Sequence, residues 1–227
     1  MTTIRNLFFP FVPVGHLKVW VLAPALDNPD PNLAYYYDFS QSIEEYTRVF
    51  SELELPWKWQ PVTLENYKMI VQEIAHEREK GIYFPVIFNL CDGDEINGAP
   101  GISVIKALEA KQLVYTGAND YFYEITTSKI PMKEAFDMAG VATPKWVAIR
   151  DNNINAKDII EKLGSPLIVK PAVSGGSLGV GVKNVVETEL ALQTQLSRMF
   201  EGYRGWNLST DGLSLIHISE PTRRTPI

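Results

Sequence analysis

Along the first half of the chain, short continuous runs of apolar residues alternate with segments in which apolar residues recur at helical spacing. Residues 18–23 form an almost wholly apolar run between Gly15 and Pro24, which is typical of a strand buried on both faces of a parallel sheet. We expect further strands at 85–89 and 114–115 and helices at 40–53, 64–80 and 102–111. The order strand, helix, helix, strand, helix, strand predicts a doubly wound open α/β sheet.

The pattern changes near Thr126, where we place a domain boundary. Helical spacing at 131–139 ends at Gly140, and a strand at 146–149, a helix at 156–163 and a strand at 167–170 follow. A glycine-rich loop then leads into another strand, and the last helix is expected at 189–200. Residues 213–227 show neither helical nor strand periodicity and carry little apolar surface, so we expect no regular structure there.

Composition narrows the class of protein. The chain is 45% hydrophobic and 21% charged, as in an ordinary globular protein with a core, and its formal charge of -6 disfavours binding to nucleic acid. The longest apolar run, 19–23, is far shorter than the roughly 20 residues that a membrane helix requires. Cys91 is the only cysteine in the sequence, which fits a reducing compartment. We therefore expect a cytoplasmic protein that binds neither nucleic acid nor a membrane.

The most informative segment follows the strand at 167–170. Lys170 supplies a compact positive charge there, and the loop after it contains small residues whose backbone N–H groups are open to an anionic ligand. These residues are Ser174, Gly175, Gly176, Ser177 and Gly179. The loop lacks the Gly-Lys-Ser/Thr of a Walker A motif and the Gly-x-Gly-x-x-Gly register of a dinucleotide fold. The glycines alone fit a hairpin connection as well as a phosphate-binding loop.

Two motifs resemble those of ATP-grasp enzymes. The first is Val-Lys-Pro at 169–171 with Ser-Gly-Gly-Ser-Leu-Gly-Val at 174–180, which is similar to the central ATP-grasp motif. The second is Thr-Thr-Ser-Lys-Ile-Pro-Met-Lys at 126–133, about forty residues earlier, which is similar to the upstream lysine motif. In addition, Phe-Asn-Leu-Cys-Asp-Gly at 88–93 and Tyr-Thr-Gly-Ala at 115–118 resemble the D-alanine–D-alanine ligase branch.

This resemblance implies a fold and an ATP site. A Rossmann-like (pre-ATP-grasp) open sheet domain would span 18–125 after an N-terminal extension at 1–17, and the first, partial ATP-grasp subdomain would span 126–206. Lys129 and Lys170 are then expected to contact the ATP phosphates. The residues expected to form a flap over these phosphates are Ser174, Gly175, Gly176, Ser177 and Gly179.

The resemblance also implies the chemistry. ATP would activate a carboxylate as an acyl phosphate, which an amine attacks to form an amide, so the expected partners are ATP and a small carboxylate or amino-acid substrate. Phosphoryl transfer of this kind depends mostly on positioning and charge neutralisation, and no catalytic side chain is assigned. The complete protein is compatible with a homodimer. A non-catalytic nucleotide-binding module of the same fold is the alternative.

Parts of the family pattern are missing from the chain. Neither the acidic and Asn ligands for Mg2+ nor the segment that contacts adenine is recognisable, so we expect both in a C-terminal portion outside this sequence and assign no metal ligand here. Residues 207–227 match nothing in the family, and their end resembles translated sequencing adapter. We predict that they are a non-native tail and that the chain is an inactive fragment. Cys-Asp-Gly at 91–93 replaces the family's His after Phe-Asn, which leaves the substrate open.

Other reactive residues have ordinary structural explanations. Cys91 has no Cys-His signature, which favours a small buried thiol over a nucleophile. Glu73 and His76 share a helix face, but a lone pair of this kind more often lies on an exposed helix surface than in a metal site. The acidic loop residues Asp92, Asp94 and Glu95 fit solvated carboxylates better than a site for a substrate ammonium, the alternative considered for Asp92.

Overall fold

The computed structural model describes residues 14–26, 37–174, 179–201 and 212–217, so most of the expected N-terminal extension lies outside it. The chain divides into two compact units, Met1–Asn119 and Asp120–Ile227. The sequence pattern placed the boundary near Thr126 instead. The helix α5 (Asp120–Thr127) lies between the two positions and belongs to the second unit. No residue of α5 is buried, although Tyr121, Phe122 and Ile125 give it apolar residues at helical spacing, and no helix was predicted there.

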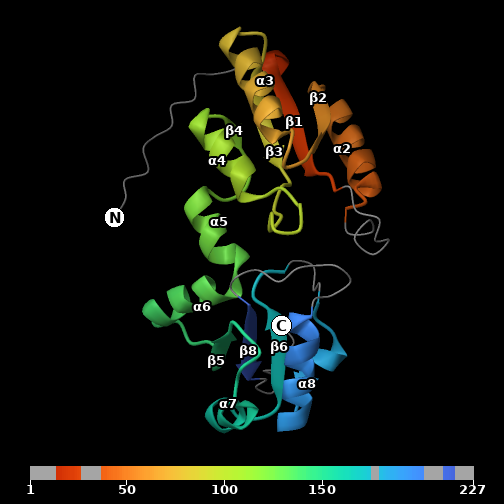
Figure 1. Cartoon of the computed structure of the whole chain (residues 1–227). Helices are drawn as coiled ribbons and strands as arrows, with labels where there is room; N and C mark the ends of the chain where they lie inside the picture. The colour runs from red at the N-terminus through yellow and green to blue at the C-terminus, as the bar shows by residue number, and fades with distance from the viewer. Residues whose placement is uncertain (1–13, 27–36, 175–178, 202–211, 218–227) are drawn as a thin grey trace, which may run out of the picture. The chain divides into compact units, whose positions relative to one another are not determined.

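A parallel four-stranded sheet forms the first unit (Figure 1). Its strands are β1 (Leu17–Pro24), β2 (Trp57–Val62), β3 (Phe84–Asn89) and β4 (Val114–Tyr115), in the spatial order β2-β1-β3-β4. β1 lies between two neighbours, and its Val21 is level with Trp59 of β2 and with Phe88 of β3. The parallel sheet confirms the expected α/β fold class.

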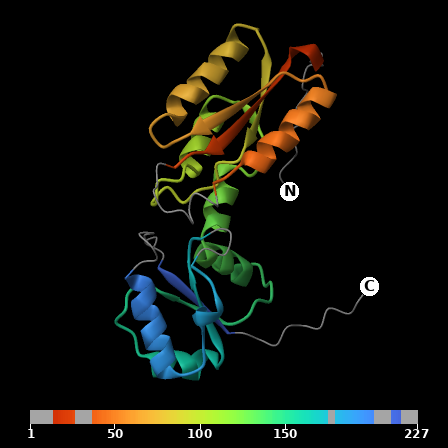
Figure 2. The same cartoon turned by 90° about the vertical axis from the view of Figure 1, so that its right-hand side faces the viewer.

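Helices cover both faces of this sheet (Figure 2). They are α2 (Ser40–Glu52) on one face and α3 (Tyr67–Glu79) with α4 (Ile102–Ala110) on the other. Phe50 of α2 packs against Val19 and Val21 of β1, whereas Trp20 and Leu22 belong to the core under α3 and α4. Because neighbouring side chains of a strand point to opposite faces, both faces of β1 need apolar residues. The apolar run predicted as a strand therefore lies where its pattern requires.

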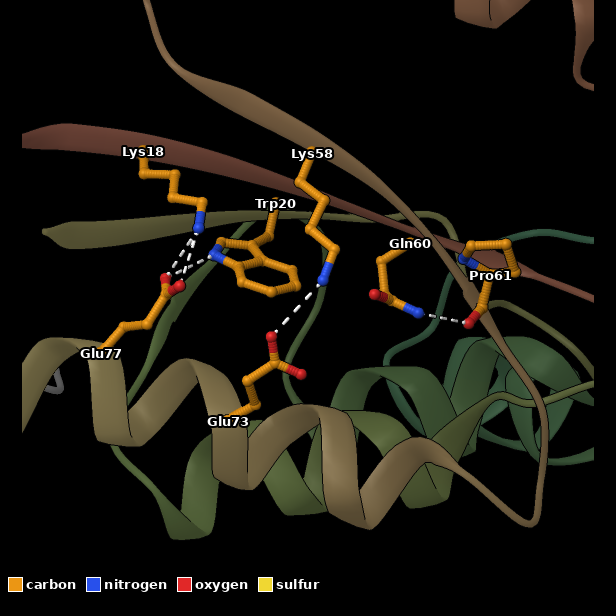
Figure 3. A network of polar contacts seen from close by, with 7 residues as sticks. All are labelled: Lys18, Trp20, Lys58, Gln60, Pro61, Glu73 and Glu77. Carbon is orange, nitrogen blue, oxygen red and sulfur yellow. Dashed lines mark hydrogen bonds and ion pairs between the residues drawn. The ribbon is translucent and has the colours of Figure 1, made fainter.

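The edge strand β2 was not predicted from the sequence. Its Trp-Lys-Trp-Gln alternation is typical of a half-buried strand, but Pro61 cannot donate a hydrogen bond to a neighbouring strand and weakens this signal. Figure 3 shows how the charge of Lys58 is accommodated. Its Nζ lies 4.3 Å from the ring centroid of Trp20 and 3.4 Å from a carboxylate oxygen of Glu73. A polar side chain of an edge strand can thus remain at the sheet surface above a buried aromatic ring.

A second set of contacts in Figure 3 joins α3 to the centre of the sheet. The Glu77 carboxylate accepts hydrogen bonds from Lys18 Nζ at 2.8 Å and from Trp20 Nε1–H at 3.3 Å. The Lys18 ammonium also lies 4.6 Å from the centroid of the Trp20 ring. Glu77 therefore satisfies the indole N–H of a fully buried tryptophan and fixes α3 against β1.

The second unit contains a four-stranded sheet with antiparallel pairs. Its strands are β5 (Trp146–Ile149), β8 (Leu213–His217), β6 (Leu167–Pro171) and β7 (Val185–Val186), given in spatial order. The helices α7 (Ala156–Leu163) and α8 (Glu189–Phe200) contribute Ile159, Leu192 and Leu196 to a core that also includes Leu167 and Val169 of β6. This core fixes the strand that carries Lys170.

The expectation that residues 213–227 have no regular structure is wrong for 213–217. These residues form β8, which lies between β5 and β6, and its Leu213 and Leu215 are fully buried. The segment Leu-Ser-Leu-Ile-His is as long as β6, and it was missed because no family motif marked it as a strand. Residues 218–227 lie outside the described part of the chain, and the non-native origin of 207–227 stays a prediction.

Removing residues 207–227 should destabilise the second unit, because β5 and β6 would each lose the strand that lies between them. We expect the free energy of unfolding to fall by more than the roughly 2–5 kcal/mol that Leu215→Ala alone would cost. Thermal unfolding and limited proteolysis of chains 1–227 and 1–206 measure the difference. Equal stability of the two chains would show that β8 does not hold this sheet together.

Candidate functional site

The two lysines that the sequence singled out come together at the start of helix α6 (Lys129–Met138). Ser128 caps this helix, since its side chain accepts a hydrogen bond from the N–H of Ile130. The N–H of Lys129 donates to the carbonyl of Ala172 at 2.8 Å, and Ser128 forms an antiparallel bridge with Val173. The start of α6 is thus fixed to the residues that follow β6, which carries Lys170.

The Lys129 ammonium lies against the first residues of the glycine-rich loop. Its Nζ donates to the Ser174 side-chain oxygen at 3.1 Å, to the Ser174 carbonyl at 3.3 Å and to the Ala172 carbonyl at 3.5 Å. Burial lowers the pKa of Lys129, and the positive charge of Lys170 lowers it further. Two cations from different elements therefore share one partly buried region, and their expected contact with ATP phosphates stays a prediction.

Lys170 lies on the opposite face of β6 from the core. Leu167 and Val169 are fully buried under α7 and α8, so the alternation of the strand turns Ile168 and Lys170 to the other side. Its ammonium is therefore not enclosed by that core and stays available to a ligand. Strand alternation, more than any local motif, decides where this charge lies.

The far end of the loop requires glycine at one position. Gly179 has a φ of +72°, and a Cβ there would lie 3.0 Å from Cγ of Pro171. A side chain at this position would be both strained and crowded. The other predicted loop residues, Gly175, Gly176 and Ser177, lie outside the described part of the chain, so the flap that they were expected to form stays a prediction.

Asn184 holds the end of the loop in place, and sequence reasoning did not find it. Its side-chain amide donates to the carbonyl of Val169 at 2.7 Å and to that of Gly179 at 2.9 Å, and accepts from the N–H of Gly181 at 2.9 Å. The residue is only 5% exposed. The one available signal was a polar side chain inside an apolar run, where a strand was expected. The structure instead has a 3-10 turn at Val182–Asn184 before the short β7.

Two acidic side chains in the loop that precedes α4 of the first unit form hydrogen bonds with neighbouring residues. The Glu95 carboxylate accepts from the N–H of Ser103 at 2.7 Å and from its hydroxyl at 2.8 Å, which caps the start of α4. Asp94 accepts from the side-chain amide of Asn97 at 2.8 Å. No described contact tests whether Asp92 pairs with a substrate ammonium.

Cys91 is excluded as a nucleophile by its surroundings. The residue is 1% exposed, and its sulfur lies 3.8 Å from the carbonyl of Leu22. Burial, together with the charge of Asp92, raises the pKa of the thiol to about 12. The thiol therefore stays protonated at neutral pH, and the reactive thiolate does not form.

The described residues provide no metal centre. Within ranges 14–26, 37–174, 179–201 and 212–217, no group of three His, Cys, Asp or Glu side chains is suited to hold an ion. Glu73, which shares a helix face with His76, is paired with Lys58 instead. In the same part of the chain no helix combines the length and hydropathy needed to span a bilayer. The charges of Lys129 and Lys170, which act on each other, suit an anionic ligand.

Parts of this chain match a family model and several known proteins. Residues 135–202 match the family model described as D-ala D-ala ligase C-terminus. A D-alanine–D-alanine ligase of Nitrosomonas europaea is 37% identical over 87 residues, which are 38% of this chain and 27% of that enzyme. The enzyme of the same name from Lactococcus lactis is 29% identical over 140 residues, which are 60% of this chain and 37% of that enzyme.

Solved structures extend the likeness to nearly the whole chain. The D-alanine–D-alanine ligase of Bacillus anthracis matches with a TM-score of 0.61 and 21% identity over 90% of this chain and 58% of that one. The biotin carboxylase domain of a Hydrogenobacter thermophilus 2-oxoglutarate carboxylase matches with a TM-score of 0.55 and 17% identity, over 89% of this chain and 44% of that one. At these identities the likeness is one of fold. Taken with the family match, it confirms that this chain resembles the D-alanine–D-alanine ligases of the ATP-grasp type.

Proposed function

We propose that this chain is the N-terminal and central part of an ATP-dependent carboxylate–amine ligase, and that Lys129 and Lys170 bind the phosphates of ATP. The observation that carries this proposal is the junction of Lys129 with Ala172, which brings the two lysine motifs into one site. A structure of the similar Bacillus anthracis ligase was determined in complex with ATP, which supports the choice of nucleotide.

In this proposal the nucleotide replaces contacts that Lys129 makes within the chain. Its ammonium is bonded at 3.1 to 3.5 Å to neutral oxygens of Ala172 and Ser174. Phosphate oxygens carry negative charge and are stronger acceptors than these oxygens. Their charge would also relieve the repulsion between the ammonium groups of Lys129 and Lys170, so both lysines would favour the phosphate-bound state.

The reaction proposed for the complete protein forms an amide in two steps. A substrate carboxylate oxygen attacks the γ-phosphorus, and the bond to the β-γ bridging oxygen breaks, which gives an acyl phosphate and ADP. An amine then attacks the acyl carbon and loses a proton, and inorganic phosphate leaves. The part played by Lys129 and Lys170 is to hold and neutralise the phosphates. The family resemblance leads us to propose that the magnesium ligands lie in a C-terminal portion outside this sequence; among the described residues no group of three His, Cys, Asp or Glu side chains is suited to hold the ion.

Replacing Lys129 or Lys170 with Met should each weaken ATP binding to the 227-residue chain by about tenfold to a hundredfold, because each loses a charge-assisted hydrogen bond to phosphate. Calorimetry or NMR titration measures the dissociation constants, and circular dichroism confirms that each variant is folded. Lys157→Met is the control, since Lys157 is exposed on α7 in a solvent-screened pair with Glu161. If both site variants bind ATP as the unchanged chain does, the assignment is wrong.

The complete protein should release ADP and phosphate at an appreciable rate only when a carboxylate and an amine are supplied together, because an acyl phosphate needs an amine acceptor to turn over. Amino-acid mixtures that contain D-alanine are the first substrates to test, with ATP alone as the control. Binding of ATP without any substrate-dependent ADP release would instead favour a non-catalytic nucleotide-binding module of the same fold.

A further inference from the structure

Lys133 lies on α6 one turn after Lys129, and it is only 7% exposed. Lysine is among the residues that are almost never fully buried unless a partner compensates the charge. The side chains of residues four apart on a helix lie on the same face, so Lys133 follows Lys129 along the side of α6. A buried charge in this position requires an explanation.

The contacts of Lys133 within the described residues are few for an ammonium group. Its Nζ donates one long hydrogen bond, 3.5 Å, to the carbonyl of Pro144, although an ammonium has three donors. No carboxylate in the described residues forms an ion pair with it within 4.0 Å. Asp137, one turn further along α6, accepts from the indole N–H of Trp146 at 3.0 Å. The Asp137 carboxylate is thus hydrogen-bonded to Trp146, and only its charge acts on Lys133.

Lys170 acts on both lysines of α6. Burial lowers the pKa of Lys133, Asp137 partly offsets this, and the charge of Lys170 lowers it further. The same Lys170 charge also lowers the pKa of Lys129. A buried cation and a partly buried cation near a third are unfavourable for folding unless a ligand compensates them, because an apolar residue of similar size would avoid the desolvation cost. The three lysines together suit a ligand that carries several negative charges.

We propose that Lys133 is a third lysine of the phosphate site, and that its buried charge strengthens nucleotide binding in proportion to the charge of the phosphate chain. This inference rests on the proposed function. It adds Lys133, whose buried charge attracts the phosphates because the residue lies near Lys129 and Lys170. ATP should therefore depend on Lys133 more than ADP does, and AMP should depend on it least.

The test measures, by NMR titration, how tightly ATP, ADP and AMP bind to the 227-residue chain and to its Lys133→Gln variant. Glutamine can still donate to the Pro144 carbonyl but has no charge, so it separates the charge from the hydrogen bond. We expect ATP to bind about fivefold to tenfold more weakly, ADP less so, and AMP nearly as before. Lys133→Arg, which keeps the charge, should recover most of the loss. Lys145→Gln, next to Pro144 but exposed, should change nothing.

Each other outcome contradicts a defined part of the account. If Lys133→Gln weakens ATP and AMP equally, or if Lys133→Arg recovers nothing, the residue has a structural role and the inference is wrong. If Lys129→Met weakens ATP but Lys133→Gln does not, the phosphate site stands and only the role of Lys133 fails. If the complete protein binds none of the three nucleotides, the proposed function fails as well.

Discussion

The junction between the start of α6 and the end of β6 is the constraint on which the proposed site depends. Two contacts form it, the hydrogen bond from the Lys129 N–H to the Ala172 carbonyl and the bridge between Ser128 and Val173. They join motifs that are about forty residues apart in the sequence. Since the backbone makes these contacts, the place of the Lys129 ammonium beside the glycine-rich loop follows from the fold and needs no ligand to form.

In this arrangement the same lysines lower the stability of the fold and favour the binding of an anion. The core under α7 and α8 stabilises the second unit, and the far side of β6 carries Lys170 beside the partly buried Lys129 and the buried Lys133. Grouped cations with few anionic partners lower the stability of a fold but prepare it for an anion. Asn184 holds Gly179, which follows in the sequence the segment expected to cover the phosphates.

Sequence patterns predicted the elements that have a strong apolar signature of their own. The run at 18–23 became β1 because both of its faces are covered. The charge of Lys170 acts on Lys129, and the expected contact of both lysines with ATP phosphates stays a prediction. Elements whose form depends on distant partners were missed. The strand β2 carries polar residues at a sheet edge, and β8 is held between β5 and β6, which lie far from it in the sequence. Asn184 could not be found because its partners are backbone carbonyls, which leave no pattern of side chains.

The central claim is that the Lys129 ammonium exchanges its contacts with the loop for contacts with phosphate, and a titration of its 15N-labelled Nζ by NMR tests this most directly. Without nucleotide, the pKa of Lys129 should lie below the ordinary value of 10.5, because of burial and the charge of Lys170. With saturating ATP it should rise, since nearby negative charge favours the protonated amine, and ATP affinity should accordingly fall as the pH rises through this range. A Lys129 pKa that is the same with and without bound ATP would contradict the account.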